Sequence, residues 1–220
     1  MKKISTLLAF VPAFAFSQSL VYDTPQNRTA LLEDFTGIHC GYCPEGHVIM
    51  ADLESVLTDR IVTVGVHAGG YAVPGVGEPD FRTDDGTAID AHFTISGYPA
   101  GVINRHLFGG LDDLGRGAWE GAVNEVLAMP SPVNVGVESS FDGTTLTVHM
   151  VALYTGDSPS GNDYFSVFVK EDHITGWQTD YLNGNHTDYD HKHVLRAYLT
   201  DTWGEDVGNH VAGDFVERTY

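Results

Sequence analysis

The chain contains two cysteines, Cys40 and Cys43, in the order Cys-Gly-Tyr-Cys. Thiols at this spacing can close a small disulfide ring and reopen it, so the pattern predicts thiol–disulfide exchange. The first thiol should lie at a helix start, where unpaired backbone N–H groups favour a negative charge and lower its pKa. We therefore expect Cys40 to be exposed and to act as the attacking thiolate, with Cys43 resolving the mixed disulfide.

His39 directly precedes the first cysteine, and a protonated imidazole there would stabilise the thiolate further.

Three other interpretations of the cysteine pair stay open. A purely structural disulfide is disfavoured because so short a loop restricts the unfolded chain little. A zinc site is disfavoured because zinc normally takes four ligands and the sequence has no second cysteine pair. The third is a fold whose thiols have lost their activity.

The elements around the cysteines can be predicted from hydrophobic patterns. Residues 30–35 form an apolar run that predicts a buried strand leading into the pair. Beyond Pro44, apolar residues recur at helical spacing and predict an amphipathic helix that begins at the second cysteine: Val48, Ile49, Leu53, Val56 and Leu57. Residues 60–67 are rich in β-branched side chains and predict a second buried strand. The thiols should therefore lie where a strand meets a helix.

The rest of the first half continues the alternation of helices and strands. Residues 69–85 are rich in glycine, proline and aspartate and form an unusually long connection, which could be a flap beside the cysteines. The patterns predict a short helix over 87–93 capped by Thr87 or Asp85, a turn and strand over 95–104, and a helix over 112–129. The first half thus predicts an α/β layer sandwich.

The second half shows strand patterns only. Prolines at 130 and 132 mark a domain boundary, and Asp142-Gly143 is a hairpin signal. Strands are predicted over 133–138, 144–154, 164–170, 194–200 and 214–217. An immunoglobulin-like sandwich has about seven strands, and only roughly five are predicted before residue 220. We therefore expect an all-β sandwich domain that is incomplete at its C-terminus.

The N-terminal residues have the pattern of a secretory signal peptide. Two lysines precede an apolar stretch over residues 4–16, and Ala15 and Ser17 occupy the positions that a signal peptidase inspects. No later apolar run reaches the ~20 residues that a membrane-spanning helix needs. We expect an exported protein in a compartment that permits disulfides, in the periplasm, at the outer membrane or on the cell surface.

Composition limits the partners. The chain carries 11 Lys and Arg residues against 30 Asp and Glu residues, a formal net charge of −19, which disfavours nucleic acid and anionic lipid surfaces. Acidic loops over 80–90 and 187–190 leave calcium binding open. The histidines at 186, 191 and 193 lie among aspartates, but their irregular spacing favours solvated turn residues over a transition-metal site. We predict no metal ion and no cofactor.

Residues 32–35, residues 39–44 and the tripeptide Gly97-Tyr98-Pro99 resemble the active site of the thioredoxin-like superfamily. The resemblance implies that Cys40 is the nucleophile and Cys43 the resolving thiol. It implies that Pro99 is a cis-proline lying against the disulfide. The dipeptide between the cysteines is similar to that of periplasmic disulfide isomerases, although this chain lacks the N-terminal dimerisation domain of those proteins.

Three further residues take their expected roles from the same resemblance. Asp34, six positions before Cys40, matches the buried acid that assists proton transfer at the second cysteine. The alternative for Asp34 is a polar side chain with its hydrogen bonds satisfied within the strand. Tyr42, between the cysteines, and Tyr98, before the proline, are expected to contact the substrate.

A second resemblance covers most of the mature chain. Residues 33–47, 97–105, 171–178 and 191–196 resemble the outer membrane protein 28 family, in which a thioredoxin-like domain precedes a β-sandwich. Together with the N-terminal pattern and the prolines near 130, it leads us to expect a signal peptide over 1–17, a thioredoxin-like domain over 18–130 and a sandwich over 131–220. It also implies an envelope location.

The function expected from these observations is that of an exported thiol–disulfide oxidoreductase. Its partners would be protein thiols or disulfides of the cell envelope. The alternative is a surface binding module, similar to an adhesin, in which the cysteine pair is structural or vestigial. The sequence leaves the redox direction and the oligomeric state open.

Overall fold

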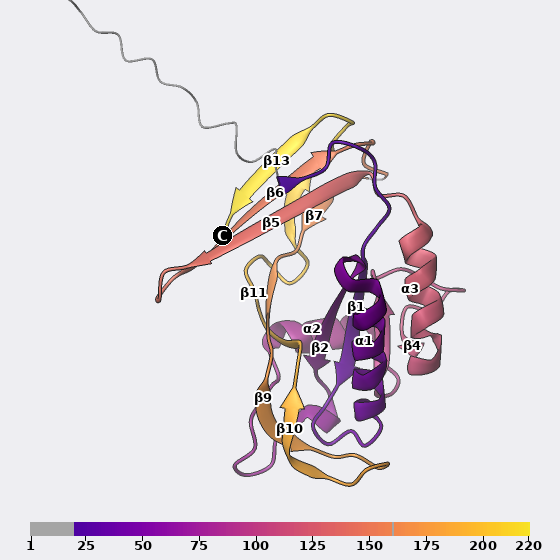
Figure 1. The fold of residues 1–220 in the computed structure, drawn as a ribbon, viewed down its shortest axis with the longest axis vertical. Coiled ribbons are helices and arrows are strands. Elements are labelled where there is room, and N and C mark those ends of the chain that lie inside the picture. Colours follow the sequence, from indigo (N-terminus) through magenta and orange to yellow (C-terminus); the bar gives the residue numbers. More distant parts are fainter. Residues whose placement is uncertain (1–19, 160) are drawn as a thin grey trace, which may run out of the picture. The chain divides into compact units, whose positions relative to one another are not determined.

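The computed structural model describes residues 20–159 and 161–220, so the predicted signal peptide lies outside the described residues. The chain divides into two compact units. The larger contains Asn27–Pro130 and Asn162–Gly208. The smaller contains Ser131–Gly161, Asn209–Tyr220 and the segment that ends at Gln26. Figure 1 shows the elements of both units, which are described separately below.

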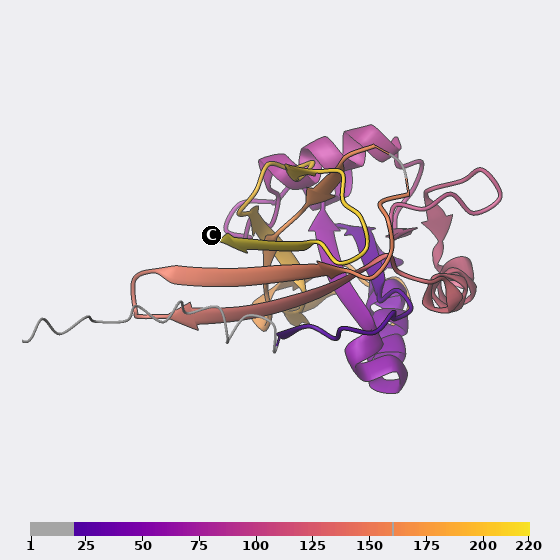
Figure 2. The same ribbon diagram turned by 90° about the horizontal axis from the view of Figure 1, so that it is seen from above.

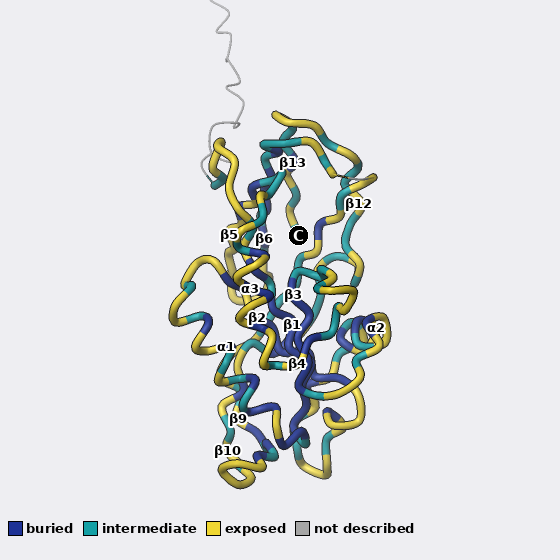
Figure 3. Tube along the Cα trace, turned by 90° about the vertical axis from the view of Figure 1, so that its right-hand side faces the viewer, coloured by how far each residue is buried: buried dark blue, intermediate teal, exposed yellow. Residues whose placement is uncertain are grey.

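The larger unit is built on a six-stranded sheet with the order β4-β3-β1-β2-β11-β8. Its two central strands, β1 (Ala30–Thr36) and β2 (Ile61–His67), are parallel and pair from Ala30↔Ile61 to Thr36↔His67. On the other side of β1 lie β3 (Ala100–Ile103) and then β4 (Leu114–Gly115), each antiparallel to its neighbour. Nearly every residue of β1, β2 and β3 is buried (Figure 3), as their apolar sequences predict.

Helices cover both faces of this sheet (Figure 2), and an apolar cluster lies under each layer. On one face, α1 (Cys43–Leu57) and α3 (Trp119–Ala128) pack with Leu32 of β1. On the other, α2 (Asp84–Phe93) packs with Phe35. Because neighbouring residues of a strand point to opposite faces, a single apolar strand supplies both clusters. The α/β layers predicted for the first half are confirmed.

Two helix predictions need correction. The helix predicted over 112–129 begins only at Trp119, because the glycine-containing residues before it form β4 and a single 3₁₀ turn, η4 (Arg116–Ala118). The helix predicted over 87–93 begins earlier, at Asp84. Its cap is Thr83, whose side-chain oxygen accepts a hydrogen bond of 2.9 Å from the N–H of Gly86.

The second half divides differently from the sequence prediction, which assigned all of 131–220 to one β domain. β11 (Val194–Tyr198) pairs in parallel with β2, and β8 (Phe168–Glu171) pairs with β11, so both strands extend the sheet of the first half. The N–H of Gly65 donates to the carbonyl of His193 at 2.7 Å. β1 occupies one edge of β2, and β11 fills the other. Strand patterns alone do not reveal which sheet a strand joins.

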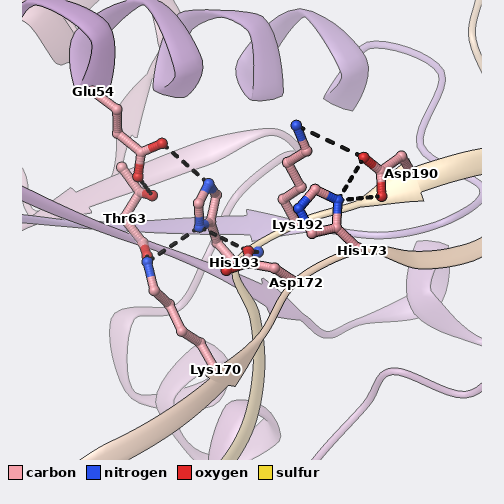
Figure 4. A network of polar contacts seen from close by, with 8 residues as sticks. All are labelled: Glu54, Thr63, Lys170, Asp172, His173, Asp190, Lys192 and His193. Atoms are coloured by element: carbon pink, nitrogen blue, oxygen red, sulfur yellow. Dashed lines mark hydrogen bonds and ion pairs between the residues drawn. The ribbon is translucent and has the colours of Figure 1, made fainter.

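A polar network holds these later strands to the first half (Figure 4). The ammonium of Lys170 donates to the carbonyl oxygen of Thr63 at 3.0 Å and lies 3.1 Å from Nδ1 of His193. The other ring nitrogen of His193 lies 3.1 Å from Glu54 of α1. The backbone N–H of His193 donates to Asp172 at 2.6 Å. The network therefore joins α1, β2 and β8 at one histidine.

Two strand pairs complete the larger unit. β9 (Ile174–Gln178) and β10 (His186–His191) form an antiparallel hairpin, and β7 (Asp163–Phe165) pairs with β12 (Glu205–Gly208). The loop of the β9–β10 hairpin, residues 179–185, returns to the cysteines, as described below.

The described residues of the smaller unit form a three-stranded antiparallel sheet with the order β13-β6-β5. It consists of β5 (Val133–Phe141), β6 (Leu146–Tyr154) and β13 (Phe215–Thr219). The predicted turn between β5 and β6 is confirmed, since Gly143 has φ +100° and the N–H of Asp142 donates to Thr145. In the part of the chain that the structure describes, no helix is long and apolar enough to cross a membrane.

Candidate functional site

Cys40 and Cys43 form a disulfide, with their Cα atoms 5.4 Å apart. α1 begins at Cys43, as predicted, and Cys40 lies in the turn before it. The N–H of Cys40 donates to the carbonyl of Gly37 at 2.9 Å, and the N–H of Cys43 to the carbonyl of Cys40 at 3.3 Å. The turn between β1 and α1 therefore sets the position of both sulfur atoms.

The disulfide is buried, contrary to the expectation that Cys40 would be exposed. Cys40 is 3% exposed and Cys43 is fully buried. The residues that cover this turn are 178–183, which we call the cover segment. The N–H of Tyr181 donates to the carbonyl of Gly41 at 2.9 Å, and the ring of Tyr181 lies so close that a Cβ atom on Gly41 would collide with it.

The cover segment is fastened to the turn by Gln178, which is fully buried. Its Nε2 atom donates to the carbonyl of Cys40 at 3.1 Å and to that of Gly37 at 3.3 Å. The N–H of Thr179 donates to the carbonyl of Ile38 at 2.8 Å. These contacts satisfy carbonyl groups of the turn, so the cover segment is part of the folded site.

Pro99 has the predicted cis peptide bond with Tyr98. The ring of Pro99 is buried against the first turn of α1, where a Cβ atom on Gly46 would lie 3.3 Å from Cβ of Pro99. The hydroxyl of Tyr98 donates to Asp90 of α2, and burial together with this bond raises the pKa of Tyr98. Tyr42 is half exposed, and its ring meets that of Tyr181 edge to face at 5.2 Å.

His39 has a partner other than the thiol. Its Nε2 atom lies 2.9 Å from a carboxylate oxygen of Glu78, in the long connection over 69–85. The backbone N–H of His39 donates to the carbonyl of Tyr71 in the same connection at 2.9 Å. The suggested flap therefore packs beside the cysteine turn, and Glu78 competes with Cys40 for the imidazole.

Asp34 is fully buried in β1, as the resemblance implied. Within the described residues neither of its carboxylate oxygens has a hydrogen-bond partner, which contradicts the alternative of a satisfied polar side chain. Burial raises the pKa of Asp34 well above its ordinary value, because the charged form is disfavoured away from water.

His47 is a site residue to which the sequence analysis assigns no role. Its Nε2 atom lies 3.6 Å from Oδ2 of Asp34 and 3.1 Å from Oγ1 of Thr36, and its Nδ1 atom lies 2.9 Å from the hydroxyl of Tyr189. Burial, with smaller contributions from His191 and His193, lowers the pKa of His47 to about 3. Its spacing of four residues from Cys43 is the signal that could have identified it.

The histidines near the end of β10 also differ from the prediction of solvated turn residues. His191 is 2% exposed, and one of its ring nitrogens lies 3.0 Å from the carbonyl of Trp177. Its ring packs against Phe81 at 4.7 Å and near His67 at 5.8 Å. Among the described residues, no group of three or more histidine, cysteine or acidic side chains could hold a metal ion.

The comparisons with known proteins bear on this arrangement. A family model described as "Outer membrane protein Omp28" matches residues 86–220, more than half of the chain. The chain belongs to the Omp28 family. The family description points to an envelope location for this Omp28 protein. A comparison with curated proteins finds no match.

Two solved structures share the fold. HBP35 of Porphyromonas gingivalis is 19% identical with a TM-score of 0.67, and the match covers 90% of this Omp28 chain and 65% of HBP35. Protein AGR_C_4864 from Agrobacterium tumefaciens is 15% identical with a TM-score of 0.54, over 88% of this chain and 78% of the other. The Omp28 chain thus spans about 65% of the length of HBP35. At these identities the likeness concerns the fold alone.

Proposed function

We propose that this Omp28 protein is an exported thiol–disulfide oxidoreductase that exchanges disulfides with proteins of the cell envelope. The observation that carries the proposal is the closed disulfide between Cys40 and Cys43 at the start of α1. The cis-proline at Pro99 and the buried Asp34 support it. We assign the first half to a thioredoxin-like domain, which β8 and β11 extend, and the signal peptide to residues 1–17.

The two thiols would act in sequence. The Cys40 thiolate attacks a substrate disulfide, a mixed disulfide forms, and one substrate sulfur leaves with its electron pair. Cys43 then loses its proton and attacks the sulfur of Cys40, which closes the internal disulfide and releases the second substrate thiolate. Two electrons pass to the substrate. The exchange needs no cofactor, because the electrons move directly between sulfur atoms.

Other residues support this chemistry in different ways. Tyr42 is exposed beside the disulfide and can contact a bound polypeptide. Tyr98 would contact the substrate through its ring, since its hydroxyl is bound to Asp90. Pro99 would present the backbone of its loop to the substrate. His39 would stabilise the thiolate of Cys40 only when it turns away from Glu78.

A redox titration and an exchange assay test the proposal together. The disulfide should have a reduction potential above the roughly −300 mV below which structural disulfides lie. The wild-type chain should reduce insulin or repair a scrambled substrate. Cys40→Ser should abolish this activity, whereas Cys43→Ser should trap a mixed disulfide at Cys40. If the wild-type disulfide resists reduction and the wild-type chain exchanges no disulfides, the proposal of an oxidoreductase is wrong.

One observation favours the alternative of a surface binding module. Val135, Val137 and Phe141 lie on one face of β5, two and four positions apart with Ser139 between the last two, and are 57%, 63% and 67% exposed. An exposed apolar row of this kind is typical of interaction surfaces. A binding module would keep its affinity for envelope proteins when both cysteines are replaced by serine, and an oxidoreductase would lose its covalent complexes.

A further inference from the structure

Cys43 and His47 lie one turn apart on α1, and Asp34 faces His47 from β1. We propose that His47 is a positioning residue for proton transfer, which passes the proton of Cys43, by way of Asp34, to the hydroxyl of Tyr189 and on to solvent. The inference rests on the proposed exchange activity, and it concerns the step in which Cys43 closes the internal disulfide.

Asp34 lies under the face of α1 that carries His47. Residues four apart on a helix share a face, so the side chains of Cys43 and His47 both point from α1 toward β1. Asp34 is fully buried, and its two oxygens have no hydrogen-bond partner in the described part of the chain. Its Oδ2 atom lies 3.6 Å from Nε2 of His47. The imidazole is the acceptor next to Asp34, but Nε2 also lies 3.1 Å from Oγ1 of Thr36, so Asp34 and His47 must close to hydrogen-bond distance before a proton passes between them.

His47 also has an exit to solvent. Its Nδ1 atom lies 2.9 Å from the hydroxyl of Tyr189 on β10. The two side chains line an open cavity of about 300 Å³ together with Ala51 and Lys192. The side chain of His47 is 18% exposed, whereas that of Asp34 is not exposed at all. His47 thus lies between an enclosed carboxyl group and water.

Burial favours the neutral form of both partners. It raises the pKa of Asp34 well above its ordinary value and lowers that of His47 to about 3. A neutral imidazole can accept a proton on one nitrogen and release one from the other, so it can pass a proton on while staying uncharged before and after. The titratable and charged groups that face it are Asp34 from β1, His67 from β2, Tyr189, Asp190 and His191 from β10, and Lys192 and His193 after β10.

Atoms and electrons balance in this step. The sulfur of Cys43 attacks that of Cys40 in the mixed disulfide, the new S–S bond forms, and the substrate thiolate leaves with the electron pair. Asp34, whose neutral form burial favours, gives its proton to Nε2 of His47, and Nδ1 releases one through Tyr189 to water in the cavity. The carboxylate left at Asp34 then takes the thiol proton of Cys43, so Asp34 and His47 both end the step neutral. Reduction of the disulfide by a substrate dithiol runs the same path in reverse.

The test isolates this step with a small oxidant. The full mature chain is reduced, mixed with glutathione disulfide and quenched at intervals, and mass spectrometry follows the decay of the mixed disulfide on Cys40 from pH 5 to pH 9. His47→Gln should slow the decay by about tenfold or more and change its pH profile. Tyr189→Phe, which keeps the ring and loses only the hydroxyl, should slow it less. His173→Gln is the matched control, since this exposed histidine pairs with Asp190 rather than with Asp34.

Two further measurements distinguish a role of His47 in proton transfer from a purely structural role. In a Cys43→Ser background, His47→Gln should leave the first attack by Cys40 unchanged. In His47→Gly, free imidazole should enter the neighbouring cavity and restore the decay rate. If His47→Gln and Tyr189→Phe both keep the wild-type rate and pH profile, the relay is wrong. Should His47→Gln fail to fold, Tyr189→Phe alone decides in the same way.

The outcome is independent of the protein substrate. Wild-type rates in both variants, with insulin still reduced, would overturn the relay and leave the proposed function in place. The opposite result is also possible. If the variants slow closure of the disulfide in the glutathione assay, but the wild-type chain exchanges with no protein disulfide, the proposed function is wrong and the relay stands.

Discussion

Asp34 is a carboxylic acid enclosed in the central strand of a sheet, and its environment determines the sign of its effect on stability. Because its pKa is raised in the folded chain, the contribution of Asp34 to stability is greatest below its ordinary pKa of 3.8 and is lost as the pH rises through the folded value. A tenfold change in the ionisation equilibrium of the carboxyl group corresponds to about 1.4 kcal/mol. A neutral side chain of the same shape should avoid this loss.

We therefore predict that Asp34→Asn raises the melting temperature, by about 2–4 °C for each kcal/mol gained, and that the gain grows from pH 4 to pH 8. Thermal unfolding of oxidised wild-type and variant chains at several pH values measures it. A difference that stays constant with pH would contradict the assigned burial effect. The variant should also close its disulfide slowly, so stability and activity change in opposite directions at this residue.

His47 has the opposite dependence. Its pKa is lowered from 6.5 to about 3, so its contribution to stability is fully present above pH 6.5 and is lost as the pH falls toward 3. We predict that His47→Gln flattens the decline of the urea midpoint over this window. The double variant Asp34→Asn/His47→Gln reports whether the two contributions are independent. An unchanged decline in His47→Gln would mean that the imidazole is charged in the folded chain.

At the scale of elements, we expect the cover segment to limit access to the disulfide. A thiolate must approach in line with the S–S bond, and Tyr181 lies over the turn that carries Cys40. We predict that Tyr181→Ala accelerates reduction of the disulfide by dithiothreitol by about tenfold, which corresponds to a change of about 1.4 kcal/mol in the barrier. Tyr164→Ala, at an exposed tyrosine of β7, is the control and should leave the rate unchanged. Equal rates in wild type and Tyr181→Ala would show that the cover segment does not limit access.

The polar network at His193 is a second element-scale feature. Lys170→Ala should destabilise the larger unit by about 1–3 kcal/mol, because it leaves the carbonyl of Thr63 without its donor. Lys192→Ala is a matched control, since its exposed 3.7 Å ion pair with Asp190 contributes little. Hydrogen exchange of the β11 amides measures the stability of the larger unit in both variants. Loss of protection in the Lys192 variant alone would contradict this assignment.

At the scale of the whole molecule, the β2 edge explains why the first half depends on later residues. Without residues 162–208, β2 loses β11, and the apolar cluster around Phe35 loses Leu195. A chain that ends at residue 130 should therefore be less stable and aggregate through the exposed β2 edge. Light scattering and urea unfolding of residues 20–130 and 20–220 compare them. A shorter chain as stable as the longer one would contradict this.

The sequence predicts what is local. Cys40 and Cys43 are three positions apart, and the strand before them and the helix after them are recognised by their own apolar periods. The contacts that finish the site are long-range: Gln178 lies 138 positions from Cys40, and Tyr189 lies 142 from His47. No periodicity connects such residues, since tertiary packing alone brings them together. The pattern after residue 131 locates β5, β6, β11 and β13, but it misses β9, β10 and β12 and joins β7 and β8 into one strand. For the same reason it leaves the sheet of each strand undetermined.

The close packing of Tyr181 on Gly41 has an evolutionary consequence. Position 41 accepts no side chain while an aromatic ring lies over it, because a Cβ atom would overlap that ring. Relatives that carry a larger residue between the cysteines must therefore have a small residue, or a displaced loop, at the position of Tyr181. The two positions should covary across the family, and such a pair would mark which members have an open disulfide.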